Sequence, residues 1–589
     1  MNKQRYKNSY YEVRPIRDLK DMIESCADLF GPRPAFWIKN KHKEPFKAIS
    51  YSQFRMDILA LGTSLMSRGL KGKSIAIIGE NSYNWVVAYF ACAFGLGVVV
   101  PIDRELPAVE IANLINRSGA SCLCYSEKLG SKIEEVMPLT TGLEQLVNLN
   151  GSVNDVKTPS FFELIEEGKV LMSEGCRDFV DIEVDPDAFF ALLFTSGTTG
   201  LAKGVMMSQK NLISNVYNMS KFVKVDGSRG LSVLPMHHAY EMTCHIMTGL
   251  YQGLEIVICE GLKHIQSNIK EMKVSVMLGV PLIFESVHKH IMRQAKAQGK
   301  LDKIEKAIDI SRKLKLYNHP GICKGIFKDI HKAFGGNISH FISGGAAINA
   351  KVIRDFEAMG FPMFQGYGMT ENAPIIAVNR DRCSKADAAG PVMPGTEVKI
   401  IDANEEGIGE VICKGPSVMM GYFDDEEATK EAIVDGWLQT GDYGYLDKEG
   451  YLYITGRKKS VIVTKNGKNV FPEEVEFYLT ESEYIEEALV HEEESIDGGD
   501  TVIKAEIFPN YALIKRDLSA DIEEDEIREF LREIVDEVNE NMPSYKRVKR
   551  IGIRREEFIK TTVRKIKRYE KENRSEEHTS ELQSQPTIS

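Results

Sequence analysis

Apolar and amphipathic segments alternate through the first three quarters of the chain. Short apolar runs typical of strands alternate with helix-like segments at residues 74–78, 85–93, 98–102, 108–117 and 121–125. Parallel strands need a crossover, which is usually a helix, so this order predicts βαβ units on a parallel sheet. The pattern returns with strands at residues 253–259, 274–280 and 338–343 and helices at residues 264–272 and 350–359.

Two later regions have a different pattern. Residues 395–414 alternate apolar and polar side chains between glycine turns, which predicts antiparallel strands in a third layer. After residue 459 we expect a compact α+β lobe, with strands at 461–464, 485–491 and 501–507, a helix opened by Pro472 and a charged helix at 521–538. The sequence therefore predicts an α/β fold, with a large N-terminal domain of parallel sheets, helices and a small β-barrel-like layer over residues 1–458 and a smaller C-terminal domain over residues 459–573.

Size and composition agree with a multidomain globular protein. The chain has 589 residues, of which 43% are hydrophobic and 27% charged, and such a length exceeds that of one typical domain. The net charge of −11 disfavours a nucleic-acid partner. The chain has no uncharged apolar run of about 18 residues and no apolar signal-peptide core at its start, so we expect a cytoplasmic protein. The ten cysteines include no Cys-x-x-Cys pair, which favours free thiols.

The last residues have an unusual origin. Residues 574–584 resemble the conceptual translation of a sequencing adapter. We therefore expect residues 574–589 to be a non-native tail and exclude them from the prediction of the fold.

Residues 192–205 combine an apolar run with a loop rich in glycine and hydroxyl groups that ends at Lys203. Glycines let backbone N–H groups approach an anion, hydroxyls can donate to phosphate oxygens, and the lysine adds positive charge. This composition suits a polyphosphate, although a surface loop could have it too. The Walker spacing Gly-x-x-x-x-Gly-Lys-Ser/Thr is absent.

Several further motifs occur in a fixed order. They are Leu-Pro-Met-His-His-Ala-Tyr-Glu at 234–241, Gln-Gly-Tyr-Gly-Met-Thr-Glu at 365–371, Gly-Trp-Leu-Gln-Thr-Gly-Asp at 436–442 and Gly-Arg-Lys-Lys at 456–459. Together with the loop at 192–205, this set resembles the adenylate-forming superfamily, which includes acyl-CoA synthetases, luciferases and adenylation domains. The resemblance runs from about residue 51 to about residue 568 and is greatest to long-chain fatty-acyl-CoA synthetases.

The resemblance implies a nucleotide site for ATP. Lys203 and the loop would surround the β- and γ-phosphates, Thr370 would donate to the α-phosphate, and Glu371, with Thr195, would hold Mg²⁺. Tyr367 would stack on adenine, Asp442 would accept the ribose hydroxyls and Arg457 would reach the nucleotide. The remaining members of this predicted site are Ser196, Gly197, Thr198, Thr199, Gly200, Gly345, Gly366 and Gly368.

The resemblance also implies a mobile small lobe. Lys565 aligns with the catalytic lysine of adenylation, although Arg564 stands where relatives carry glycine and Ile559 where they carry proline. The same run could be a solvated basic face. Lys459 matches the hinge between the two half-reactions, and Gly467 would line the channel for the pantetheine of coenzyme A.

The predicted acyl pocket draws on His238, Tyr240, Phe284 and Gly344. Gly344 leaves room beside the adenylate, and Phe284 offers an apolar wall. His238 could instead be a core histidine without function. A zinc site at His238 and Glu241, with His237 and His245 nearby, would need a defined set of ligands, and the chain has neither a His-Glu-x-x-His spacing nor a cysteine partner there.

These observations predict ATP-dependent ligation of a fatty acid to coenzyme A through an acyl-adenylate, with release of pyrophosphate and then AMP. Transfer to the phosphopantetheine of a carrier protein shares every motif. A nucleotide-binding regulator that has lost catalysis is a further alternative, raised by Arg564. Membrane contact would be peripheral at most, through Lys3, Arg5 and Lys7 with nearby tyrosines.

Overall fold

The computed structural model describes residues 10–39, 41–151, 158–195, 202–225, 229–381, 384–463, 469–494, 501–560, 566–568 and 570–574. Contacts between Cα atoms divide the chain into two compact units. Unit 1 comprises Met1–Lys399, Ile412–Thr440 and Leu446–Tyr453, and unit 2 comprises Ile400–Val411, Gly441–Tyr445 and Ile454–Ser589. The boundary between residues 458 and 459 stays a prediction.

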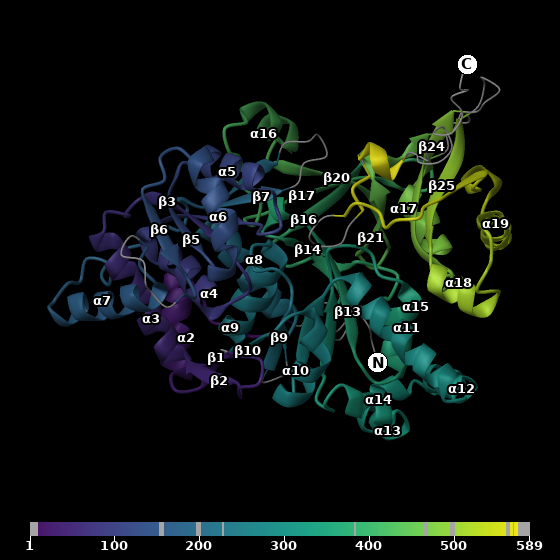
Figure 1. The fold of residues 1–589 in the computed structure, drawn as a ribbon, viewed down its shortest axis with the longest axis horizontal. Helices are drawn as coiled ribbons and strands as arrows, with labels where there is room; N and C mark the ends of the chain where they lie inside the picture. Colours follow the sequence, from purple (N-terminus) through teal and green to yellow (C-terminus); the bar gives the residue numbers. More distant parts are fainter. Residues whose placement is uncertain are drawn as a thin grey trace, which may run out of the picture. The chain divides into compact units, whose positions relative to one another are not determined.

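The first sheet of unit 1 has seven strands (Figure 1). Their order is β18 (Gly421–Tyr422), β8 (Lys203–Ser208), β7 (Phe189–Thr195), β4 (Gly97–Ile102), β3 (Lys73–Ile78), β5 (Ala120–Tyr125) and β6 (Gln145–Asn148). The strands β7, β4, β3, β5 and β6 are parallel to one another. At one edge, β8 is antiparallel to β7, and β18 is antiparallel to β8. The βαβ pattern predicted for residues 74–125 is therefore confirmed, with the helix α5 at Ala108–Arg117 between β4 and β5.

The helix after β3 begins two residues before the predicted start at residue 85. Ser82 accepts a hydrogen bond from the backbone N–H of Trp85, so this side chain caps α4 at Tyr83–Ala91. The chain then continues as a π-helical turn at Cys92–Leu96, in which Gly95 has a φ of 107°. The apolar run alone did not reveal the cap, because serine breaks the hydrophobic pattern.

The second sheet of unit 1 has eight strands. Their order is β14 (Ile375–Val378), β13 (Met363–Gly368), β12 (His340–Ser343), β11 (Val276–Gly279), β9 (Arg229–Ser232), β10 (Glu255–Ile258), β1 (Pro34–Ile38) and β2 (Lys47–Ser50). All are parallel to their neighbours except the edge strands β14 and β2. Phe284, Phe341, Phe356 and Phe361 belong to the core beneath it.

The helices α10 (Ile265–Met272), α11 (Pro281–Ala297), α12 (Leu301–Leu314) and α15 (Ala350–Ala358) contribute to the same core. The short helices α13 (Pro320–Ile326) and α14 (Lys328–Ala333) complete this group. The other α-helices of unit 1 are α2 (Leu19–Phe30), α3 (Tyr51–Ser67), α6 (Gly130–Val136), α7 (Phe161–Ser173), α8 (Gln209–Phe222), α9 (Thr248–Gln252) and α16 (Glu426–Ala432).

The third sheet confirms the antiparallel layer predicted around residues 395–414. It contains β15 (Gly390–Pro391), β21 (Tyr451–Arg457), β20 (Trp437–Leu446), β17 (Gly409–Lys414) and β16 (Glu397–Ile401), with β19 (Ile433–Val434) beside β20. The division into units runs through its four longer strands, since each of them has residues in both units.

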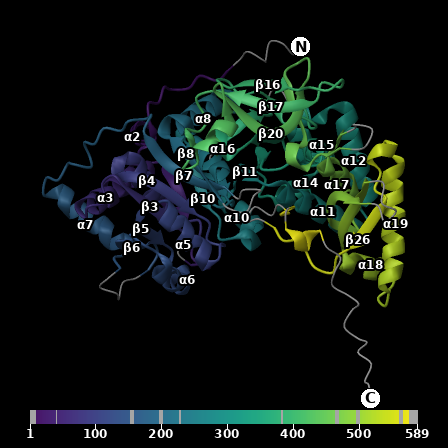
Figure 2. The ribbon, with the colours of Figure 1, turned by 90° about the horizontal axis from the view of Figure 1, so that it is seen from above.

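The C-terminal part of unit 2 forms the predicted α+β lobe. A sheet of β24 (Ile485–Glu494), β25 (Thr501–Pro509) and β26 (Arg550–Ile553) shares a core with α17 (Pro472–Leu479) and α19 (Glu524–Glu540). A two-stranded ladder of β22 (Ile462–Val463) and β23 (Asn469–Val470) precedes it, and α18 (Tyr511–Asp517) follows β25. Figure 2 shows α18 and α19 beside this sheet. None of the helices in the described ranges combines the length and apolarity needed to span a bilayer.

Close packing of α7 on α3 yields the first prediction. A Cβ atom at Gly168 of α7 would overlap the carbonyl oxygen of Ala60 in α3, and backbone cannot give way as a flexible side chain can. We expect Gly168→Ala to lower the melting temperature by several degrees, because overpacking costs about 1–3 kcal/mol. The matched control is Gly130→Ala in α6, where nothing lies within 4 Å of an added Cβ. Equal melting temperatures for the two variants would contradict this packing.

Candidate active site

The predicted site residues of unit 1 follow the carboxyl ends of neighbouring strands. The strands β9, β11, β12 and β13 are parallel, so their carboxyl ends lie at one edge of the second sheet. The chain reaches His238 and Tyr240 after β9, Phe284 after β11, Gly344 and Gly345 after β12, and Thr370 and Glu371 after β13. Ligands in open α/β sheets bind at such an edge.

The first sheet contacts the carboxyl edge of the second sheet through Asn81. This residue follows β3, and its side-chain amide donates to the carbonyl of Leu234 at 2.6 Å and accepts from the N–H of Met236 at 3.1 Å. Asp103, which follows β4, lies 3.7 Å from Nε2 of His237. The loop after β9 therefore lies against the carboxyl edges of both sheets.

The phosphate loop predicted from the sequence connects two antiparallel strands. β7 pairs with β8 so that Thr195 is opposite Lys203, and Oγ1 of Thr195 donates to the carbonyl of Lys203 at 3.4 Å. A strand–loop–strand connection differs from the strand–loop–helix of a Walker motif, as the spacing predicted. The predicted site residues Ser196, Gly197, Thr198, Thr199 and Gly200 lie outside the described residues.

Lys203 and Glu371 are joined by a tyrosine that the sequence analysis missed. The ammonium of Lys203 lies 4.7 Å from the ring centroid of Tyr422, and the Tyr422 hydroxyl donates to Oε1 of Glu371 at 2.9 Å. Tyr422 lies in β18, which pairs with β8. A cation and a carboxylate from distant parts of the sequence thus share one phenol. A Gly-Tyr pair offers little signal in the sequence.

The two glycines beside Tyr367 are required by close backbone packing. A Cβ atom at Gly368 would overlap the carbonyl oxygen of Pro374, and one at Gly366 would lie 3.2 Å from Cγ2 of Val378. Tyr367 between them and Thr370 after them are both half-buried. These contacts explain the Gly-Tyr-Gly pattern by packing against β14, and the stacking of Tyr367 on adenine stays a prediction.

Two residues of the predicted acyl pocket lie against each other. The hydroxyl of Tyr240 donates to the carbonyl of Ile342 at 3.2 Å, and a Cβ atom at Gly344 would lie 2.7 Å from Cζ of Tyr240. The small residue at position 344 therefore lets the tyrosine ring lie over the backbone. Gly345, with a φ of 85°, is exposed next to it.

The other two residues of the predicted acyl pocket, Phe284 and His238, lie in different surroundings. Phe284 is buried in the core and packs against Phe341, with 5.4 Å between ring centroids. The ring of His238 is half-buried and lies 4.1 Å from that of His237. Glu241 and His245, considered above as metal ligands, form a buried pair at 2.9 Å within the π-helical segment Tyr240–Met247. The pair uses Nδ1 of His245 and Oε1 of Glu241, while the buried Nε2 and Oε2 have no hydrogen-bond partner among the described residues.

Unit 2 holds the remaining predicted nucleotide contacts. Oδ1 of Asp442, a buried carboxylate, lies 2.9 Å from Nε of Arg457, whose side chain is half exposed. Lys459, the predicted hinge, is exposed in the short turn Lys458–Ser460. Gly467, the predicted channel residue, lies outside the described part of the chain.

Lys565 also lies outside the described residues, but both flanking segments are tightly held. Lys560 and Ile566 form an antiparallel bridge, and the N–H of Lys567 donates to the carbonyl of Ile559 at 2.9 Å. The buried side chain of Asn573 donates to the carbonyls of Ile559 at 3.0 Å and Lys567 at 2.9 Å. Sequence patterns gave no signal for Asn573, because an asparagine near a chain end is most often solvated.

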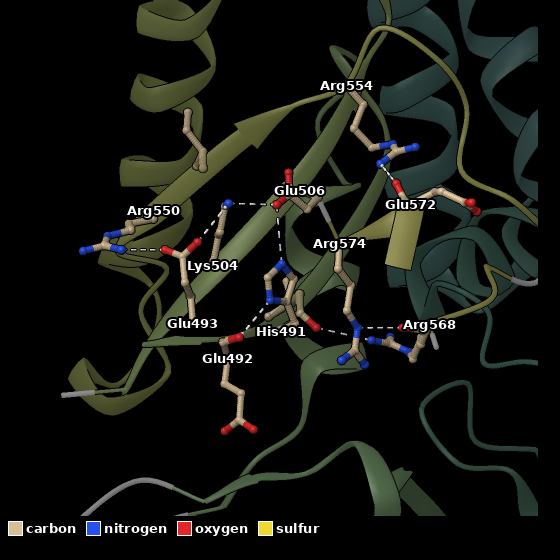
Figure 3. Close-up of polar contacts among 12 residues, drawn as sticks. His491, Glu492, Glu493, Lys504, Glu506, Arg550, Arg554, Arg568, Glu572 and Arg574 are labelled. Atoms are coloured by element: carbon tan, nitrogen blue, oxygen red, sulfur yellow. Dashed lines mark hydrogen bonds and ion pairs between the residues drawn. The ribbon is translucent and has the colours of Figure 1, made fainter. Parts of the chain in front are cut away.

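Arg568 anchors the segment that follows Lys565 (Figure 3). It forms an ion pair with Glu476 of α17 and donates to the carbonyl of Val490 in β24 at 3.3 Å. Burial raises the pKa of Glu476, while the Arg568 guanidinium lowers it. On the same sheet, Lys504 bridges the carboxylates of Glu493 and Glu506 at 3.0 Å each. The arginine that ends the basic run at 560–568 thus belongs to a packed ion pair, whereas charge runs are usually solvated.

His237 is held uncharged at the edge of the site. Burial and, to a smaller extent, the nearby Arg104 guanidinium lower the pKa of His237 to about 3. The distance of 3.7 Å to Asp103 is too long for a hydrogen bond that would favour the charged form.

This shift predicts a pH-dependent stability. Between the ordinary pKa of 6.5 and the folded value of about 3, the unfolded chain binds a proton at His237 that the folded chain does not. Stability should therefore fall as pH falls below 6.5, by about 1.4 kcal/mol per pH unit from this group. We expect His237→Asn to flatten the decline of the melting temperature between pH 6.5 and 4.5. His290→Asn, at an exposed histidine, serves as control, and parallel curves for wild type and His237→Asn would refute the assignment.

Comparisons with known proteins identify similar sequences. The sequence model described as AMP-binding enzyme matches residues 24–423. The chain is 27% identical over 544 residues to the chloroplastic long-chain-fatty-acid–[acyl-carrier-protein] ligase AEE15 of Arabidopsis thaliana, covering 80% of this chain and 74% of that protein. It is also 27% identical over 453 residues to the long-chain-fatty-acid–CoA ligase FadD15 of Mycobacterium bovis, covering 74% and 73%.

Solved structures show the same fold. The anthranilate CoA ligase AuaEII in complex with anthranoyl-AMP aligns with a TM-score of 0.73 at 20% identity, covering 97% of this chain and 98% of that one. O-succinylbenzoate coenzyme A synthetase from Bacillus subtilis, in complex with ATP and magnesium ion, aligns with a TM-score of 0.69 at 21% identity, covering 93% and 98%. The match to the sequence model covers more than half of the chain. The protein therefore belongs to the AMP-binding enzyme family and has the adenylate-forming fold.

Proposed function

We propose that this protein activates a long-chain fatty acid with ATP and transfers the acyl group to the thiol of coenzyme A. The acid first forms an acyl-adenylate with release of pyrophosphate, and the thiol then displaces AMP. The observation that carries the proposal is the grouping of Lys203, Tyr422 and Glu371 next to the hairpin of β7 and β8. This grouping sets a cation and a carboxylate beside the predicted phosphate loop.

Adenylation requires a carboxylate to attack the α-phosphorus of a polyanion. The main barrier is repulsion between negative charges, which fixed cations and hydrogen-bond donors reduce. Lys203 would neutralise phosphate oxygens, and Thr370 would donate a hydrogen bond from the turn that also carries Glu371. Lys203 stands on β8, which pairs with β7 and β18, and Thr370 stands in the turn between the paired strands β13 and β14. Both groups therefore need little reorganisation during the reaction.

The residues fit a magnesium ion. Mg²⁺ prefers hard oxygen ligands and keeps several waters, and Glu371 supplies a half-buried carboxylate with the Thr195 hydroxyl as a second candidate ligand. Bound Mg²⁺ would supply positive charge to the leaving pyrophosphate. Tyr422 would orient the Glu371 carboxylate by its hydrogen bond at 2.9 Å.

The proposed length of the acyl chain and the proposed acceptor are inferred from the names of the relatives. Two relatives are named for long-chain fatty acids, one with coenzyme A and one with an acyl carrier protein as acceptor. We favour coenzyme A, with the carrier protein as the alternative. Cytoplasmic location is part of the proposal, since coenzyme A and ATP are plentiful there.

The test is acid-dependent AMP release from ATP. Acetate, octanoate, palmitate and an aryl acid are each supplied alone, with coenzyme A, or with a phosphopantetheinylated acyl carrier protein. AMP release that requires palmitate and coenzyme A is expected. The Lys565→Ala variant is the inactive control, expected to lose adenylation and to keep thioester formation from preformed palmitoyl-adenylate. AMP release only with the carrier protein would select the alternative acceptor, and none with any acid would favour a regulator that has lost catalysis.

Tyr422 gives a second functional prediction. Tyr422→Phe removes the hydrogen bond to the Glu371 carboxylate while keeping the ring beneath Lys203. We expect acid-dependent pyrophosphate exchange to slow about tenfold, the loss corresponding to one hydrogen bond to a charged group, with a higher Mg²⁺ concentration at half-maximal rate. Tyr478→Phe, at an exposed tyrosine of α17, is the matched control. An unchanged Mg²⁺ dependence would show that Tyr422 does not position Glu371.

A further inference from the structure

The helices that follow β11 carry an unusual number of exposed apolar side chains. Of the twenty large hydrophobic residues exposed in the described ranges, five lie between residues 310 and 326. They are Ile310, Leu314, Tyr317, Ile322 and Ile326, exposed by 52%, 66%, 40%, 50% and 48%. A soluble surface seldom gathers such residues in so short a segment unless something covers them.

The same helices are strongly basic. Residues 281–333 hold twelve lysines and arginines against five aspartates and glutamates, a net charge of +7, whereas the whole chain has a net charge of −11. Most of these cations are exposed, including Lys303, Lys306 and Lys313 of α12. Within the described part of the chain these three lysines have no acidic partner at ion-pair distance.

The spacing on α12 places charge and apolar surface together. Ile304, Ile308 and Ser311 form the inner stripe of this helix, with Ile308 and Ser311 fully buried. Lys303, Lys306, Ile310, Lys313 and Leu314 recur at intervals of three and four residues on the outer side. On α13, Ile322 and Ile326 stand one turn apart and are both exposed, while Cys323 of the same helix is buried.

We propose that the outer surface of α12 and α13, with the turn at Tyr317, docks on an anionic lipid bilayer. Exposed apolar side chains would enter the boundary between headgroups and acyl chains, while the lysines would remain with the anionic headgroups. The two attractions act together, and either alone gives only weak binding to a bilayer.

The charge and the apolar side chains of this surface argue against two other occupants, a second copy of the chain and a nucleic acid. An isologous contact with a second copy would bring two basic surfaces together, since residues 301–326 hold six lysines and arginines against three aspartates and glutamates. Like-charge repulsion opposes such a contact. A nucleic acid would use the lysines but leave five apolar side chains in water. An anionic bilayer complements both features.

The surface is continuous with an element of the candidate site. The helix α11 begins at Pro281, carries Phe284 in its first turn and packs against α12, and the group of α11, α12 and α14 lies together in both views (Figures 1 and 2). The further consequence, that the bilayer is the source of the acid, rests on the proposed function. The docking itself does not.

The test measures flotation of the full chain with vesicles, without ATP, acid or coenzyme A. Vesicles of phosphatidylcholine are compared with vesicles that contain a quarter phosphatidylglycerol. Binding is expected to the anionic vesicles alone, and salt of about 0.5 M, which shortens the Debye length to a few ångström, should weaken it. Binding equal for both compositions, or to neither, would overturn the proposal.

Two sets of variants locate the surface. The triple change Lys303→Glu, Lys306→Glu and Lys313→Glu should reduce binding at least tenfold, and its control Lys71→Glu, Lys263→Glu and Lys448→Glu, with the same change in net charge, should retain it. The pair Ile310→Ser and Leu314→Ser should also reduce binding, with Leu29→Ser and Val109→Ser as control. Equal losses in test and control variants would refute the location.

Two further measurements distinguish lipid docking from a dimer interface and from a loss of catalysis. If light scattering shows a dimer that the Ile310→Ser and Leu314→Ser pair dissolves, the surface is an interface between copies and the proposal is wrong. Octanoate-dependent AMP release, from an acid that dissolves in water, should be unchanged in all four variants. Vesicle binding without any AMP release would contradict the proposed function and leave the docking surface supported.

Discussion

The side-chain amide of Asn81 is the contact on which the arrangement of the site in unit 1 depends. It holds both the carbonyl of Leu234 and the N–H of Met236, so the loop after β9 of one sheet is fixed to the end of β3 in the other. Two parallel sheets each present their carboxyl ends at an edge. This amide links the two edges directly, and the residues that follow β9 stand where both sheets end.

The charged side chains of the site also come from segments that are distant in the sequence. Lys203 and Tyr422 come from the paired strands β8 and β18, and Glu371 comes from the turn between the paired strands β13 and β14. His237 is kept neutral nearby by burial and by Arg104. The buried imidazole therefore adds no positive charge at this edge, and the ammonium of Lys203 beside Tyr422 provides it.

The sequence predicted elements where a periodic pattern coincided with the true boundary. The helix Ala108–Arg117 is an example, because its apolar stripe ends at a turn. The sequence pattern missed the boundary where a polar residue set it, as with Ser82 before α4. It also gave no expectation for the helices at 281–333, because their many lysines obscure the apolar stripe. Tyr422 could not be found, since its two partners lie 219 and 51 residues away and only pairing of β18 with β8 brings them together. Asn573 was missed for the same reason, because its role depends on hydrogen bonds to Ile559 and Lys567 that the sequence does not reveal.

The path of the chain between the two units limits how the protein can be dissected. Unit 2 includes Ile400–Val411 and Gly441–Tyr445, which are separated in sequence from its main part after Ile454. A single cut at residue 458 would leave Asp442 on one fragment and Lys565 on the other. The N-terminal fragment would contain all of unit 1, whereas unit 2 would be divided between the two fragments. Exchanging C-terminal lobes between relatives at this junction would therefore leave Ile400–Val411 and Gly441–Tyr445 with the N-terminal fragment.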